Sequence, residues 1–112
     1  MYRSGKVLYK GMAAGTVWQD DEGYGFTYDP AYQQIRGASS VSLTLPLRSE
    51  PYHSKTIIPF FDGLIPEGWL LDITVKNWKL DPSDRMELLL TVCKDCIGAV
   101  SIERNKEEED NE

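Results

Sequence analysis

The sequence has no apolar run that approaches the roughly 20 residues needed to cross a membrane as a helix. Its N-terminus, MYRSGKVLYKG, is basic, but no apolar segment of about 7–15 residues follows, as a secretory signal would require. From these absences we expect neither a membrane-spanning helix nor a secretion signal. We therefore expect a protein of the cytoplasm with no membrane partner.

Residues that bind metals or act as nucleophiles are scarce, with one histidine and two cysteines in 112 residues. Cys93 and Cys96 form a CKDC motif, which elsewhere can be a redox pair or half of a zinc site. Here the motif falls at the end of a predicted helix, away from the positive dipole end that activates a thiol. Only His53 and scattered acids remain to complete a zinc site. We predict structural thiols, no metal and no cofactor, with a thiol-dependent enzyme as an alternative.

Motifs of other active sites are also missing. His53 lies in EPYHSK, without a serine–aspartate or HExxH setting, and is predicted to be a loop or helix-start residue. The glycine-containing segment GMAAG lacks the lysine and the strand–loop–helix order of a phosphate-binding loop. No pair of carboxylates has a spacing that suggests acid–base catalysis. We therefore predict that the chain is not an enzyme.

Basic residues are fewer than acidic ones, 12 against 18, for a net charge of −6. Residues 103–112, ERNKEEEDNE, hold six acids and two bases and so carry −4, which leaves −2 for the first 102 residues. Direct nucleic-acid binding is not expected, because phosphate contacts need clustered Lys and Arg. The acidic segment has no apolar residue to bury, so we predict one domain over residues 1–102 and a disordered tail over 103–112. A role for this tail in attracting a basic partner is the alternative.

Short segments with alternating apolar residues predict strands in the first half of the chain. They are KVLYK (6–10), GTVW (15–18), YGFTY (24–28) and VSLTLPL (41–47). Between the last two, DPAYQQI (29–35) begins with an Asp-Pro pair that favours one short helical turn. Trp18 falls within a predicted strand and is expected in or beside the core.

Helical patterns follow from residue 54 onward. SKTIIPFFDGL (54–64) predicts a short helix with Ser54 as its candidate cap, although Pro59 fits poorly in its interior. Leu71, Val75 and Trp78 then recur at helical spacing and predict a helix over about 68–79.

A third helix is predicted to begin at DPSD (81–84), with Asp81 as its cap and Pro82 in its first turn. Its apolar face comprises Met86, Leu89, Leu90, Cys93 and Ile97. Gly98 ends it, and AVSI (99–102) is a final strand. The fold class predicted is therefore a small single α+β domain, in which antiparallel strands precede three short helices and a final strand.

FFDGLIPEGW (60–69) combines buried residue types with the backbone breakers Gly63, Pro66 and Gly68. Phe60, Phe61, Leu64 and Ile65 are expected in the core. Trp69 instead lies out of phase with the apolar face of the helix that follows. It either packs the start of that helix onto the phenylalanines or is a partly exposed anchor for another protein, since Trp is enriched at interface hot spots.

Three blocks of the sequence, SVSLTLPL (40–47), FFDGLIPEG (60–68) and IGAVSI (97–102), resemble the N-terminal subdomain of HipA-type toxin kinases in order and spacing. The resemblance covers residues 5–102. The phosphate-binding loop, catalytic Asp and metal-binding residues of a HipA kinase have no counterpart in these 112 residues. The chain therefore resembles the small HipS-type protein of toxin–antitoxin systems that also encode a shortened HipT kinase and a helix-turn-helix HipB protein.

This resemblance implies an antitoxin-like partner that binds and restrains a HipA- or HipT-like Ser/Thr kinase. The predicted partner-binding residues are Asp62, Gly63, Pro66, Glu67, Gly68 and Trp69. The alternative is an accessory subunit that completes the kinase without inhibiting it, with a HipB-like protein as the antitoxin in a ternary complex.

Overall fold

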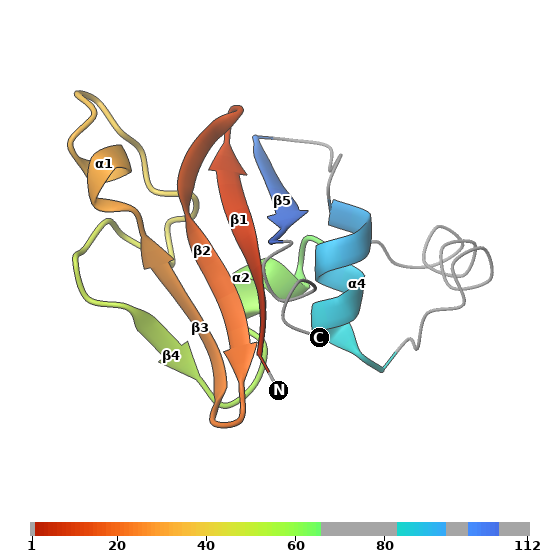
Figure 1. Ribbon diagram of the computed structural model, residues 1–112. Coiled ribbons are helices and arrows are strands. Elements are labelled where there is room, and N and C mark those ends of the chain that lie inside the picture. Colours follow the sequence, from red (N-terminus) through yellow and green to blue (C-terminus); the bar gives the residue numbers. More distant parts are fainter. Residues whose placement is uncertain (1, 66–82, 94–98, 106–112) are drawn as a thin grey trace.

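The computed structural model describes residues 2–65, 83–93 and 99–105, and in these residues a five-stranded antiparallel sheet dominates (Figure 1). The strand order is β4-β3-β2-β1-β5. The strands are β1 (Arg3–Tyr9), β2 (Met12–Asp20), β3 (Gly23–Tyr28), β4 (Tyr52–Ser54) and β5 (Val100–Arg104). The strands predicted over 6–10, 15–18, 24–28 and 99–102 are confirmed, as is the α+β class.

Two tight turns connect the first three strands. Lys10 and Gly11 both have positive φ, 51° and 83°, the backbone that a two-residue hairpin between right-twisted strands requires. At the β2–β3 turn, the Asp20 carboxylate accepts backbone N–H bonds from Glu22 at 2.9 Å and Gly23 at 3.1 Å. Gly therefore favours the first turn through its backbone geometry, and Asp favours the second through local hydrogen bonds.

The described helices are short: α1 (Pro30–Gln33), α2 (Pro59–Asp62) and α4 (Arg85–Val92). The short helical turn predicted over 29–35 is confirmed as α1. The predicted start of the next helix at Ser54 is wrong, because Ser54 ends β4 and α2 begins at Pro59. A proline has no N–H to donate and fits the first turn of a helix, where no donor is needed.

The cap of α4 also differs from the prediction. Asp84, not Asp81, is the residue before this helix, and its side chain accepts the Glu87 N–H. An Asp at this position satisfies a free backbone donor of the first turn and carries charge favourable to the helix dipole. Asp81, Pro82, Gly98 and the helix predicted over 68–79 lie outside the described residues.

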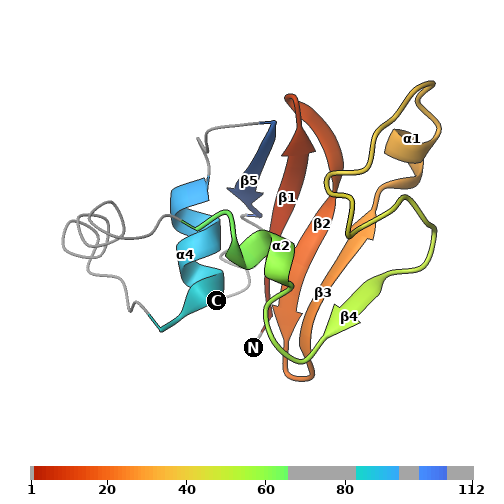
Figure 2. The same cartoon turned by 180° about the vertical axis from the view of Figure 1, so that it is seen from behind.

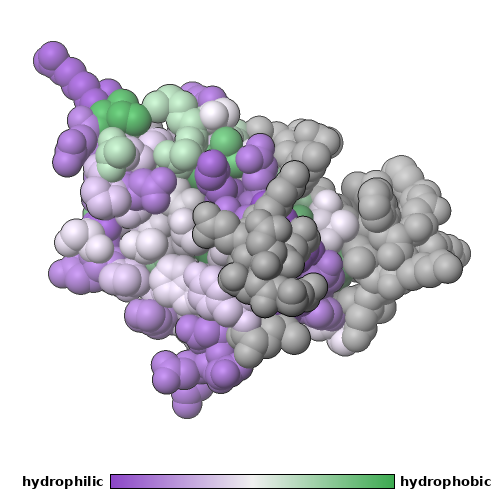
Figure 3. All heavy atoms as spheres, in the orientation of Figure 1, coloured by the Kyte–Doolittle hydropathy of each residue, from purple (hydrophilic) through white to green (hydrophobic). Residues whose placement is uncertain are grey.

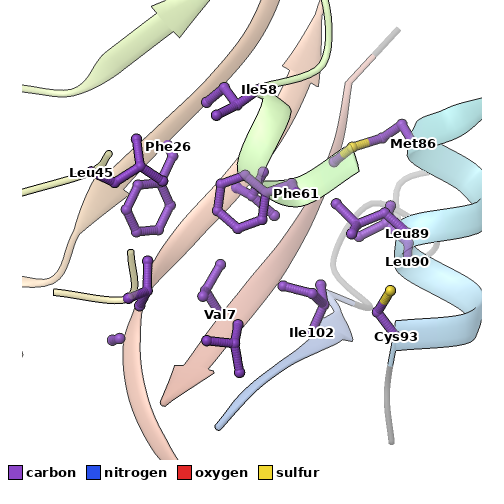
Figure 4. Packing of buried hydrophobic residues seen from close by; sticks show 14 of the residues in the cluster. Val7, Phe26, Leu45, Ile58, Phe61, Met86, Leu89, Leu90, Cys93 and Ile102 are labelled. Atoms are coloured by element: carbon purple, nitrogen blue, oxygen red, sulfur yellow. The ribbon is translucent and has the colours of Figure 1, made fainter. Parts of the chain in front are cut away.

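Among the described helices, α2 lies against one side of the sheet, in front of the strands in Figure 2, and α4 lies next to β5. Side chains from the strands meet α2 and α4 there and form the core, as Figure 4 shows: Val7, Phe26, Phe61, Met86, Leu89, Leu90, Cys93 and Ile102. The predicted burial of Met86, Leu89, Leu90 and Cys93 is thus confirmed, whereas Ile97 lies outside the described residues. A Cβ on Gly5 would stand 2.6 Å from the Leu90 side chain, so the glycine allows α4 to approach β1 closely.

The strand predicted over 41–47 is wrong. Ser42 and Leu45 form only an isolated bridge across a tight turn, with the Leu45 N–H donating to the Ser42 carbonyl at 3.1 Å. Val41 and Leu45 are buried, but Leu43 between them is 96% exposed. Reversal of the chain at Leu43 brings the two flanking residues to the core and turns the middle one outward.

The opposite face of the sheet carries Trp18, which is half-buried as expected. Its ring lies over Gly25, where a Cβ would stand 2.1 Å from the indole, and meets the His53 ring edge-on at 6.0 Å. His53 is an exposed residue of β4, so its predicted place in a loop or helix start is wrong. Gly25 of β3 pairs with His53, and this places the histidine beside Trp18. The strand was not predicted, because three residues are too few to show an alternating pattern.

At the C-terminal end, β5 continues two residues past the predicted domain boundary at 102. Lys6 pairs with Glu103 and Gly5 with Arg104, and the Asn105 N–H donates to the Ser4 carbonyl at 3.0 Å. The first residues of the acidic segment therefore belong to the sheet, and residues 106–112 lie outside the described ones. Within the ranges that the structure describes, no helix has the length and apolar character needed to span a membrane.

Candidate partner interface

Two of the predicted partner-binding residues, Asp62 and Gly63, lie at the end of α2. The Asp62 carboxylate accepts a hydrogen bond from Nε of Arg85 at 2.6 Å and so links α2 to α4. Gly63 is exposed, and its N–H donates to the Pro59 carbonyl at 3.0 Å. Its φ is −68°, so any residue could adopt this backbone. Pro66, Glu67, Gly68 and Trp69 lie outside the described residues.

Residues 60–65 contact the core, as predicted for the four apolar residues among them. Phe61 and Ile65 are buried, and Phe60 and Leu64 pack against the core. The Leu64 carbonyl accepts a hydrogen bond at 3.3 Å from the thiol of Cys93, the residue that follows α4. The Asp62–Arg85 pair and this thiol contact both join the segment to α4, so Pro66 follows a well-anchored stretch of chain.

A cluster of charged residues joins α4 to both of its neighbouring strands. Arg3 of β1 donates to the Asp84 carboxylate through both terminal nitrogens at 2.9 Å and lies 3.5 Å from Glu87. Arg104 of β5 donates to the other Glu87 oxygen at 2.6 Å. The Arg3 hydrogen bond holds the pKa of Asp84 below its usual value, aided by the Glu87 N–H and the two arginine charges and opposed by partial burial. This cluster could not be predicted from the sequence, because its members are far apart in the chain.

A second set of contacts fastens residues 39–46, named here the tyrosine-held segment. The Tyr28 hydroxyl donates to the Leu45 carbonyl and accepts the Val41 N–H at 2.9 Å. The Tyr32 hydroxyl donates to the Ser39 carbonyl at 2.6 Å, and the Tyr52 hydroxyl to the Pro46 carbonyl. Burial raises the pKa of the Tyr28 and Tyr32 hydroxyls. The only sequence signal for these contacts was the richness in tyrosine.

The surface differs in character between its parts. Figure 3 shows the helix-free face of the sheet as mostly hydrophilic or neutral, with hydrophobic residues gathered toward the end where α1 and the β1–β2 turn lie. Among the described large apolar residues, Met12 and Ile35 are 45% and 40% exposed, against 96% for Leu43. Leu43 thus has almost no contact with the rest of its own domain.

The structure offers little chemistry for catalysis in the part of the chain it describes. Cys93 is buried, as predicted, and Cys96 lies outside the described residues. A shallow hollow between the β2–β3 turn and β4 is lined in part by Asp20, His53 and Lys55. No group of three or more potential metal ligands occurs among the described residues.

Both the sequence and the fold of this chain are similar to those of known proteins. Residues 5–103 match the family described as HipA N-terminal domain. A solved structure of the N-terminal domain of HipA toxin superposes with a TM-score of 0.70 at 34% identity, over 92% of each chain.

Two relatives differ in how much of their length the domain occupies. An uncharacterized protein of Haemophilus influenzae (strain ATCC 51907 / DSM 11121 / KW20 / Rd) is 37% identical over 107 residues, which are 96% of this chain and 97% of that protein. The kinase-like protein Y4mE of Sinorhizobium fredii (strain NBRC 101917 / NGR234) is 31% identical over 97 residues, 86% of this chain but only 23% of Y4mE. Because the family match covers residues 5–103 of the 112, this chain belongs to the HipA N-terminal domain family.

Proposed function

We propose that this chain is a non-enzymatic, antitoxin-like partner that binds and restrains a HipA-family Ser/Thr kinase in the cytoplasm. The observation that carries this proposal is the match to Y4mE, in which the same kind of domain is covalently part of a much longer kinase-like chain. A domain that belongs to a kinase chain in one relative has a surface suited to the rest of that chain. The Haemophilus relative, in which the domain is nearly the whole protein, supports an interaction between separate chains.

The proposed contact surface is Asp62–Trp69, with Trp69 as its anchor. The described part of this stretch supports the choice, because Phe61 and Ile65 are buried and Asp62 is paired with Arg85, so the residues directly before Pro66 are held in place. Less flexibility before binding means less entropy lost on binding. In this proposal, the Glu67 carboxylate makes a charged contact with basic residues of the kinase that bind the phosphates of ATP.

The test is substitution of Trp69. Trp69→Ala is expected to leave the fold intact and to weaken binding of a HipA-family kinase from the same genome by about thirtyfold, the effect of losing about 2 kcal/mol at a hot spot. Inhibition of kinase autophosphorylation should weaken in parallel. Trp69→Phe, which keeps an aromatic ring, is the matched control and should retain most of the inhibition.

Circular dichroism and thermal unfolding of both variants separate the possible results. A folded Trp69→Ala protein that inhibits as well as the wild type would show that Trp69 is not the anchor. An unfolded variant would place Trp69 in the core instead.

The second candidate is an accessory subunit that completes the kinase, with a HipB-like helix-turn-helix protein as the antitoxin. The same match to Y4mE favours it, since there the domain is part of the kinase-like chain itself. Co-expression separates the two. Rescue of growth from kinase toxicity by this chain without the helix-turn-helix protein supports restraint, and rescue only with that protein supports the accessory role.

A further inference from the structure

Leu43 is the most exposed large apolar residue that the structure describes, at 96%. Burial of a leucine side chain stabilises by about 1.5–3 kcal/mol relative to exposure, so this residue contributes almost nothing of that kind to its own domain. Its position is also unlike that of a residue at a frayed end, because the residues on either side are held in the core.

The turn that carries Leu43 is built to hold one conformation. Val41 and Leu45 are 6% and 4% exposed, and the Tyr28 hydroxyl bonds the backbone of both. Within the turn, the Ser42 hydroxyl accepts the Thr44 N–H at 3.2 Å and lies 2.9 Å from the Thr44 hydroxyl. A side chain presented on such a turn loses little backbone freedom when it binds, which favours affinity.

The turn lies on the helix side of the sheet. Figure 4 shows Leu45 on the same side as Phe26, Ile58 and Phe61, and Phe26 and Phe61 have ring centroids 5.3 Å apart. Ile58 is the residue directly before α2, and Phe61 lies within this helix. The turn and the described part of the proposed surface, Asp62 and Gly63 at the end of α2, are therefore on the same side of the sheet.

We propose that Leu43 is a second anchor for the kinase and enters an apolar pocket on the kinase part of a HipA-family protein. This inference rests on the proposed function and adds a contact remote in sequence from Trp69. The kinase part is the proposed partner because the match to this domain covers only 23% of Y4mE. The rest of that kinase-like chain is therefore a large potential partner for the domain within one protein. The apolar chemistry of Leu43 requires a pocket lined by apolar side chains, in contrast to the charged contact proposed for Glu67.

The experiment measures the affinity of the full-length chain for a HipA-family kinase from the same genome by isothermal titration calorimetry. Leu43→Ala is expected to weaken binding at least tenfold, with unchanged circular dichroism and thermal unfolding. Ile35→Ala is the matched control, because Ile35 is also apolar and exposed but lies beyond the end of α1. It should change the affinity by no more than about twofold, as expected of a residue outside a hot spot.

Several results would overturn the inference in distinguishable ways. Equal affinities of the wild type and Leu43→Ala would exclude Leu43 as an anchor but leave the proposed function standing. No binding by the wild type would contradict the proposed function itself, and the inference with it. Sedimentation of the chain by itself gives the last test, because a dimer that Leu43→Ala abolishes would assign this residue to contact with a second copy.

Discussion

Two of the elements that cover the helix side of the sheet are attached in different ways: α4, next to β1 and β5, and the tyrosine-held segment, next to β3 and β4. The helix makes its own backbone hydrogen bonds and is attached through apolar side chains and the charges of Arg3, Glu87 and Arg104. The tyrosine-held segment has no regular backbone pairing beyond one bridge, so tyrosine hydroxyls bond its N–H and C=O groups. Buried backbone groups must find partners, and where secondary structure does not supply them, side chains do.

The two regions also differ in how far their apolar side chains are exposed to solvent. The face of α4 that carries Met86, Leu89 and Leu90 is buried within the domain. The tyrosine-held segment buries Val41 and Leu45 but leaves Leu43 exposed. Apolar residues in α4 therefore serve stability, whereas one in the tyrosine-held segment is available to a partner.

The largest expected difference in stability is between two leucine-to-alanine substitutions, one in each region. Leu89→Ala should lower the free energy of unfolding by about 2–5 kcal/mol, because the side chain is fully buried and its removal leaves a cavity. Leu43→Ala, which removes the same atoms from an exposed position, should change it by no more than about 0.5 kcal/mol. Urea unfolding followed by circular dichroism measures both. A loss above 1 kcal/mol for Leu43→Ala would mean that this residue supports its own fold.

An intermediate effect is expected where the tyrosine-held segment is fastened. Tyr28→Phe keeps the ring but leaves the Leu45 carbonyl and the Val41 N–H without their partner, which should cost about 1–3 kcal/mol. Tyr52→Phe is the control, since its hydroxyl bonds the carbonyl of the exposed Pro46, where water can take its place. Thermal unfolding compares them, and equal losses would contradict a special role for the buried hydroxyl.

The smallest effect is expected at the charged attachment of α4. Asp84→Asn keeps a good helix cap but removes the charge that pairs with Arg3, and should cost about 0.2–1 kcal/mol at neutral pH. The pKa of Asp84 is lowered in the folded protein, so its contribution is present above the ordinary carboxyl pKa of about 3.9 and is lost as the pH falls through the lower folded value.

Urea titrations at several pH values test the sign of this effect. The stability difference between the wild type and Asp84→Asn should be constant near neutrality and shrink below about pH 3.9. Glu50→Gln, which makes the same change of charge at an exposed position, is the control. A difference that grows on acidification would contradict the assigned direction.

Much of the fold follows from patterns within single segments. The strands around KVLYK, GTVW, YGFTY and AVSI and the buried face of α4 were predicted because alternation and helical spacing report burial on one element at a time. The same reasoning failed at 41–47, where alternation of Val41, Leu43 and Leu45 reflects a turn with two buried flanks instead of a strand. It failed again at Ser54, where a three-residue strand is too short to show a period.

The candidate site was predicted less completely. Within FFDGLIPEGW, the placement of Phe60, Phe61, Leu64 and Ile65 in or against the core was correct. The structure adds that Asp62 is paired with Arg85. The exposure of Leu43 was not predicted, because the residue sits in a pattern that normally means burial. The role of Trp69 as an anchor stays a prediction.

The sequence by itself determined the α+β class, the strands, the apolar face of α4 and, through three short blocks, the family. Only the tertiary structure decided that Arg3 meets Asp84 across 81 positions of sequence, that tyrosine hydroxyls bond the backbone of the tyrosine-held segment and that Leu43 faces outward. The physical reason is that a pattern records which side of a segment avoids water. The partners of a polar group, and the side chains left without any, depend on which distant segments the folded chain brings together.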